Sequence, residues 1–140
     1  MKIHTTNYNN TLIAVADDCP CSAGTIPPLK KETLTMAGIQ YQMLVEHPYE
    51  FTSDEILFQL HASKHQVPKQ EYQQAFAQFF SKGQACFRAS PLTKRYGWGV
   101  HFNEVGKMAL VGMETENYQQ LLHDETLQVV KAMRSSKASS

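Results

Sequence analysis

The stretch that decides the fold is a predicted β-hairpin, YGWGVHFNEVGKMALVGM, at residues 96–113. In the first half, Trp98, Val100 and Phe102 alternate with other residues, as apolar side chains do along a strand that has one buried face. The halves flank Asn103-Glu104-Val105-Gly106, a four-residue loop that ends in glycine, as hairpin loops commonly do. We therefore predict two antiparallel strands, over residues 96–102 and 107–113.

Outside the hairpin, the sequence predicts one further strand and a series of helices. Residues 11–16 are apolar and bounded by Asn10 and Asp17, which is typical of a short buried strand. Residues 34–46 fit both a strand and a helix, and we favour a helix capped by Thr35 because the stretch is long. Further helices are expected from Thr52 onward, over 68–82 with a Gly83 cap, over 115–122 and over 124–133, with a short strand at 85–89.

These elements predict an α+β fold. We expect a small antiparallel sheet, made of the N-terminal strand and the C-terminal hairpin, to pack against four or five helices. A chain of 140 residues fits one domain and can bury a core without disulfides or metals. We assign residues 1–134 to a single globular domain and expect the small, polar residues 135–140 to form a disordered tail.

Composition and charge restrict the function. The formal net charge is zero, which argues against a general nucleic-acid binder. No stretch has the length and hydropathy of a signal peptide or a membrane span, so we expect a cytoplasmic protein with no membrane partner. The three cysteines, Cys19, Cys21 and Cys86, are an odd number, and cytosolic thiols are normally reduced, so a disulfide framework is not expected.

One run of the chain concentrates positive charge. Residues 72–103 contain four basic side chains but no aspartate or glutamate, whereas the segments on either side are mildly acidic. Side chains alternate along a strand, so Gly97, Gly99 and His101 share the face opposite Trp98 and the core. Two glycines on one face leave the backbone open to close approach by a ligand or by another element of the chain. This glycine face of the 96–113 hairpin is the predicted site for a small molecule or an anion.

Basic and aromatic side chains near this face supply the expected ligand contacts. Arg88 and Arg95 would donate forked hydrogen bonds to an anion, and Lys94 would add a point charge. Tyr96 or Trp98 would stack on a planar group of the ligand if the two faces of the hairpin were reversed. The structural alternative is that these basic side chains are solvated or paired with acidic residues.

Catalysis would depend on two residues. His101 is the candidate acid or base, and Cys86 is the candidate nucleophile, with Arg88 to lower its pKa and His101 to accept its proton. Both residues also have a structural alternative. In it, a helix packs on the glycines beside His101, and Cys86 is a buried core thiol. The sequence leaves open whether the chain is an enzyme, and it indicates no cofactor.

No metal site is predicted. Cys19 and Cys21 lie two residues apart, but a structural zinc site needs a second pair of ligands. His61 and His65 share one helix face at a spacing that can chelate a metal, but the glutamate of the metalloprotease signature does not follow His61. We interpret these two histidines as a boundary side chain and a solvated one.

Several short motifs occur together along the chain. The most specific are FSKGQ at 80–84 and KRYGWG at 94–99, accompanied by HTTNY at 4–8, DCP at 18–20, EHPY at 46–49 and TSD at 52–54. In this combination the chain resembles an uncharacterised family of small, mostly bacterial proteins known as a domain of unknown function. The resemblance runs from His4 to about Arg134. The family has no assigned activity, so the resemblance implies none.

Three functions therefore stay open. The first is small-molecule or anion binding, enzymatic or not, on the glycine face. The second is winged-helix-like nucleic-acid binding, because three predicted helices precede a hairpin, although the 68–82 helix is hardly basic. The third is a protein–protein interaction domain, in which the basic strip meets an acidic partner or forms a dimer interface. The oligomeric state is open.

Overall fold

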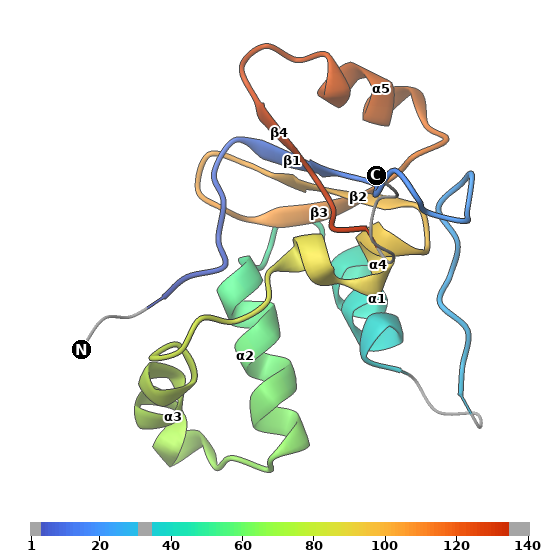
Figure 1. Ribbon diagram of the computed structural model, residues 1–140. Helices are drawn as coiled ribbons and strands as arrows, with labels where there is room; N and C mark the ends of the chain where they lie inside the picture. Colours follow the sequence, from blue (N-terminus) through green and yellow to red (C-terminus); the bar gives the residue numbers. More distant parts are fainter. Residues whose placement is uncertain (1–3, 31–34, 135–140) are drawn as a thin grey trace, which may run out of the picture.

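A computed structural model describes residues 4–30 and 35–134, and a four-stranded sheet lies at its centre (Figure 1). The strands are β1 (Thr11–Ala14), β2 (Trp98–Phe102), β3 (Met108–Gly112) and β4 (Gln128–Lys131), in the order β3-β2-β1-β4. β2 is antiparallel to both of its neighbours, whereas β4 is parallel to β1. The predicted α+β class, the hairpin and the N-terminal strand are confirmed.

The prediction of a helix at 124–133 is wrong, because this segment contains β4. The carboxylate of Asp124 accepts hydrogen bonds from the backbone N–H and the hydroxyl of Thr126, which forms a turn after the preceding helix. The chain then runs along β1, with Val130 opposite Ile13. This fourth strand makes the sheet mixed rather than purely antiparallel.

Most of the predicted helices form, and polar side chains cap them as expected. The α-helices are α1 (Met36–Glu46), α2 (Ser53–Lys64), α3 (Tyr72–Phe79), α4 (Pro91–Lys94) and α5 (Glu116–Leu122), with 3-10 turns η1 (Lys69–Glu71) and η2 (Phe87–Ala89). The hydroxyl of Thr35 accepts from the Gly38 N–H, and Thr52 and Glu55 form a capping box at the start of α2. No helix among the described residues has the length and apolar character needed to span a membrane.

Two local predictions around α3 are wrong. The helix expected over 68–82 is shorter, and it ends at Phe79 with Phe80 rather than Gly83 as its cap. Residues 85–89 contain η2 instead of a strand. The backbone turns here because the Ala89 and Ser90 N–H groups donate to the Cys86 and Phe87 carbonyls, and the Ser90 hydroxyl then accepts from the Leu92 N–H at the start of α4. The predicted tail, residues 135–140, lies outside the described residues.

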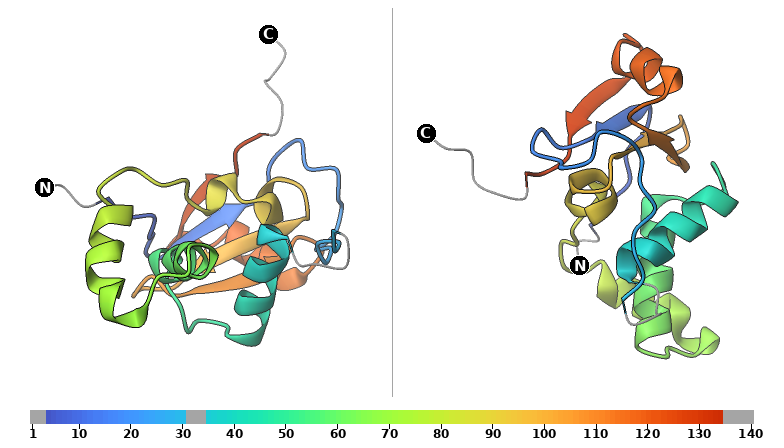
Figure 2. Two further views of the ribbon diagram at one scale, coloured as in Figure 1. Left: turned by 90° about the horizontal axis from the view of Figure 1, so that it is seen from below. Right: turned by 90° about the vertical axis from the view of Figure 1, so that its right-hand side faces the viewer.

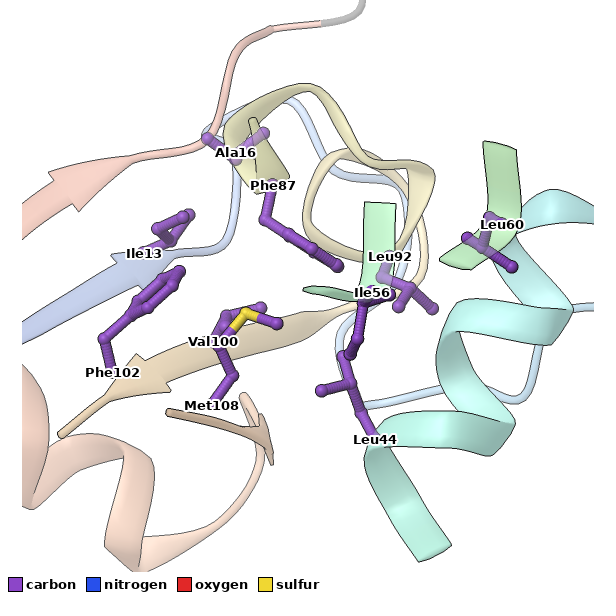
Figure 3. Close-up of a cluster of buried hydrophobic side chains, with 11 residues drawn as sticks. Ile13, Ala16, Leu44, Ile56, Leu60, Phe87, Leu92, Val100, Phe102 and Met108 are labelled. Carbon is purple, nitrogen blue, oxygen red and sulfur yellow. The ribbon is translucent and has the colours of Figure 1, made fainter. Parts of the chain in front are cut away.

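Helices cover both faces of the sheet (Figure 2). On one face, Ile13, Val100 and Phe102 meet side chains from α1, α2 and the η2–α4 segment, which forms the main core (Figure 3). On the other face, Tyr118 of α5 packs on Leu12 and its neighbours. α3 lies beyond α2, away from the sheet, and contacts α2 through a separate aromatic cluster (Figure 1).

Candidate functional site

The predicted glycine face is packed against other parts of the chain. Gly97 has a left-handed φ of +78°, and a Cβ at this position would collide with the carbonyl group of Ala23. A Cβ on Gly99 would lie 2.7 Å from the Tyr118 ring, whose hydroxyl accepts a hydrogen bond from the Val15 N–H at 3.0 Å. The glycines thus allow α5 and the loop before α1 to pack closely. The structure contradicts the expectation that this strip is bare.

His101 lies further along the same face and is bonded to Tyr49. The Tyr49 Oη and the His101 Nδ1 are 2.8 Å apart, and the two rings meet edge to face. Tyr49 has a φ of +58°, which is costly for a bulky residue and occurs more often at functional sites than elsewhere. Burial lowers the pKa of His101, while the negative charge of Asp124 opposes this shift. His101 stays a candidate acid or base, with Tyr49 as its partner.

Cys86 lies on the opposite side of the sheet, beside Tyr8. Its Sγ is 3.6 Å from the Tyr8 Oη, and the Tyr8 ring packs edge-on against Phe102 in the main core. Burial and the contact with Cys86 raise the pKa of Tyr8, whereas the charge of Arg88 lowers it. Phe102 and His101 are adjacent in β2 and point to opposite faces. The predicted pairing of Cys86 with His101 as its base is therefore wrong.

The basic residues lie on two successive short elements, η2 and α4. The Nε of Arg88 donates a hydrogen bond of 2.7 Å to the backbone oxygen of Lys131 in β4. Lys94 and Arg95 lie at the end of α4, where Arg95 is exposed. That Lys94 and Arg95 hold an anion remains a prediction.

Trp98 and Tyr96 hold the loop before α1 against the hairpin. The indole Nε1 of Trp98 donates to the Thr25 carbonyl at 2.9 Å, and the Thr25 N–H donates to the Tyr96 carbonyl at 2.8 Å. The Trp98 ring also packs on Tyr41 at a centroid distance of 5.5 Å and against Gly24. Trp98 faces the main core as predicted, and these contacts give it a structural role.

Cys86 lines a groove that the sequence did not predict. Two cavities of about 200 and 270 Å³ adjoin, because Gln40, Leu57 and Ala85 line both of them. Together they form one groove between α1, α2 and residues 84–91, which we call the Cys86 groove. Cys86 and Ser90 lie at the smaller end, and His61, Lys64, His65 and Phe79 lie at the larger end.

Lys64 and two imidazoles line the larger end of the Cys86 groove. The imidazoles of His61 and His65 lie 4.6 Å apart between centroids, and His61 also packs on Phe79 at 4.4 Å. Burial lowers the pKa of His61, and the charges of His65 and Lys64 lower it further. Among the described residues, none that lines these two cavities carries a carboxylate, and Glu71 lines a neighbouring cavity that His61 and His65 also border. An anionic group bound there would relieve this like-charge repulsion.

Hydrogen bonds fix two amide side chains of the groove. The Ser90 hydroxyl donates to the Gln40 Oε1 at 2.7 Å in a buried contact. The Gln84 Nε2 donates to the Phe79 carbonyl at 2.7 Å. These bonds join the segment that carries Cys86 to both α1 and the end of α3.

The sequence singled out some of the groove residues one by one, but it did not indicate that they share one groove. The spacing of His61 and His65 indicated a shared helix face, which the structure confirms, and Cys86 was already a candidate nucleophile. The sequence contains no signal that residues 84–91 lie beside α2, because this contact depends on tertiary packing. Among the described residues, no group of three metal-binding side chains gathers anywhere, including beside this histidine pair.

Comparison with known proteins gives the family but no activity. The sequence profile of a family of unknown function, DUF6157, matches residues 3–138. No curated protein and no solved structure matches the chain. The profile spans nearly all of the chain, which confirms the resemblance to an uncharacterised family. The chain therefore belongs to DUF6157, a family of unknown function.

Proposed function

We propose that the chain binds a small anionic molecule with an apolar part in the Cys86 groove. The observation that carries this proposal is the lining of the groove, which is cationic at one end and largely apolar in its middle. Lys64 and the two imidazoles offer N–H donors to a carboxylate or phosphate group. Leu57 and Leu60 offer apolar surface to the remainder of the ligand.

The thiol supports an extension of this proposal to catalysis. Cys86 lies at the end of the groove opposite the cationic side chains. A ligand that spans the groove would therefore have its anionic group near Lys64 and its other end near the Cys86 sulfur. Cys86 remains the candidate nucleophile, with Tyr8 rather than His101 as its hydrogen-bonding neighbour.

The other two hypotheses have less support. In the winged-helix hypothesis, α3 is the helix that would contact the nucleic acid. It has no lysine or arginine between Tyr72 and Phe79. Protein–protein interaction through the basic end of α4 stays a hypothesis that depends on the exposure of Arg95.

Titration with benzoate and phenyl phosphate, followed through the NMR signals of the histidine rings, tests the proposal. We expect saturable shifts at His61 and His65. We also expect about fivefold weaker binding by Lys64→Met, since a partly exposed ion pair contributes up to about 1 kcal/mol.

Lys69→Met is the matched control, because Lys69 lies in η1 and does not line the Cys86 groove. It should bind both ligands as the wild type does. Equal weakening by the two substitutions, or equal affinity for benzoate and the neutral benzamide, would contradict the proposal.

A further inference from the structure

A second and larger groove lies on the other side of α2. It has a volume of about 510 Å³ and is lined by Met43 of α1, Phe51, Glu55 and Phe58, and by Tyr72 and Phe76 of α3, together with two glutamines. We call it the aromatic groove. It shares no lining residue with the Cys86 groove.

The aromatic walls of this groove face different directions. The Phe58 ring meets the Tyr72 ring at 88° and the Phe76 ring at 62°, with centroids 5.5 and 5.2 Å apart. Phe58 is buried, whereas Tyr72 and Phe76 are half-buried. The half-buried rings of Tyr72 and Phe76 are the more accessible ones, and an organic cation is attracted to an aromatic face within about 6 Å.

The charge of the groove agrees with a cationic ligand. Glu55 is the one charged residue among the described lining residues. Its Oε1 accepts a hydrogen bond of 2.9 Å from the Thr52 N–H in the capping box of α2, which orients the carboxylate at the start of the helix. A carboxylate held beside aromatic rings favours a ligand that combines positive charge with apolar surface.

We infer that the aromatic groove binds an organic cation of the alkyl- or arylammonium class. The apolar body lies among Met43, Phe58 and Phe76, and the ammonium group faces Glu55 and the aromatic ring faces. A bare metal ion does not fit this site, because one carboxylate and aromatic carbon atoms are a poor ligand set for it.

Benzyltrimethylammonium is the probe, and methionine methyl signals are the readout. Met43 lines the aromatic groove, whereas Met36 lines the Cys86 groove, so one spectrum separates the two sites. The cation should shift the Met43 signal saturably and leave the Met36 signal in place. This inference is independent of the proposed anion site. If the Cys86 groove does not bind anions, benzoate leaves the Met36 signal unshifted, whatever the cation does to the Met43 signal.

Two glutamate variants make the test specific. Glu55→Gln removes the charge but keeps an acceptor suited to the capping box, so the fold is retained. It should weaken binding of the cation about threefold to tenfold. Glu71→Gln changes an exposed residue of η1 that does not line the aromatic groove, and it should bind as the wild type does.

Three results would overturn the inference. The first is an equal affinity of Glu55→Gln and wild type for the cation. The second is a Met43 shift by neutral benzyl alcohol at the same concentrations as the cation. The third is a concentration-dependent dimer in sedimentation whose formation is blocked by Phe76→Glu, since the groove would then be covered by a second copy of the chain.

Discussion

His101 shows how its surroundings set the charge of one side chain. Burial lowers the pKa of this imidazole, and the charge of Asp124 offsets the shift only in part. The hydroxyl of Tyr49 lies 2.8 Å from its Nδ1. The folded protein thus favours the neutral ring, and protonation of His101 must reduce the free energy of unfolding.

We expect the protein to lose stability as the pH falls below the ordinary histidine pKa of about 6.5. Below that pH the unfolded chain binds a proton at residue 101 more readily than the folded chain does. The loss continues until the pH passes the lowered pKa of folded His101, and His61 contributes with the same sign. Urea unfolding at about pH 7.5 and about pH 5 measures this loss.

The His101→Gln variant isolates the contribution of one ring. It should lose less stability than the wild type between the two pH values, because glutamine does not titrate. An equal loss in both proteins would show that the protonation of His101 is not linked to folding.

The connections between elements determine how the sheet and helices pack. Gly97 lies between α4 and β2 with φ at +78°, directly against the backbone of Ala23. Gly83 lies between α3 and η2, and a Cβ there would meet nothing within 4 Å. The two glycines of these connections therefore have different structural roles, although each lies within two residues of a basic side chain in the sequence.

Gly97→Ala should destabilise the protein by about 2 kcal/mol or more, because a left-handed φ costs an alanine about 1–2 kcal/mol and the methyl group also collides with the Ala23 carbonyl. Gly83→Ala should be neutral or stabilise by up to about 1 kcal/mol. Urea unfolding of both variants compares the two connections. Similar free energies of unfolding would contradict the packing described for Gly97.

The elements that depend on interactions between residues close together in the sequence could be predicted. The start of α2 at Thr52 and the β2–β3 hairpin each depend on residues close together in the sequence, and both were predicted correctly. β4 was missed because its pairing with β1 joins residues more than a hundred positions apart. Its sequence around Leu127 and Val130 also fits helical spacing, so periodicity alone could not identify it.

Across the whole molecule, α2 separates two grooves of opposite charge. Leu57, His61 and Lys64 line the Cys86 groove, whereas Glu55 and Phe58 line the aromatic groove. A helix with apolar side chains on both sides can contact α1, α3 and residues 84–91 at once. Figure 1 shows α3 beside α2. Tyr72 and Phe76 of α3 line the aromatic groove, whereas Gln84, in the connection to η2, lines the Cys86 groove.

The candidate site could be predicted only in part. Cys86 was identified from its chemistry and its basic surroundings, and it does line a groove. Its partners were not identified, because the placement of His61 and Tyr8 near residues 84–91 results from packing between distant segments. The glycine strip was misinterpreted for the same reason, since only the tertiary structure reveals that Tyr118 covers Gly99.

The most direct test of anion binding in the Cys86 groove is alkylation of its thiol. Iodoacetamide labelling, followed by mass spectrometry of each cysteine peptide, compares Cys86 with Cys19 and Cys21, which do not line the groove. Saturating phenyl phosphate should slow the labelling of Cys86 and leave the other two rates unchanged. An unchanged rate at Cys86, or equal slowing at all three cysteines, would contradict binding in this groove.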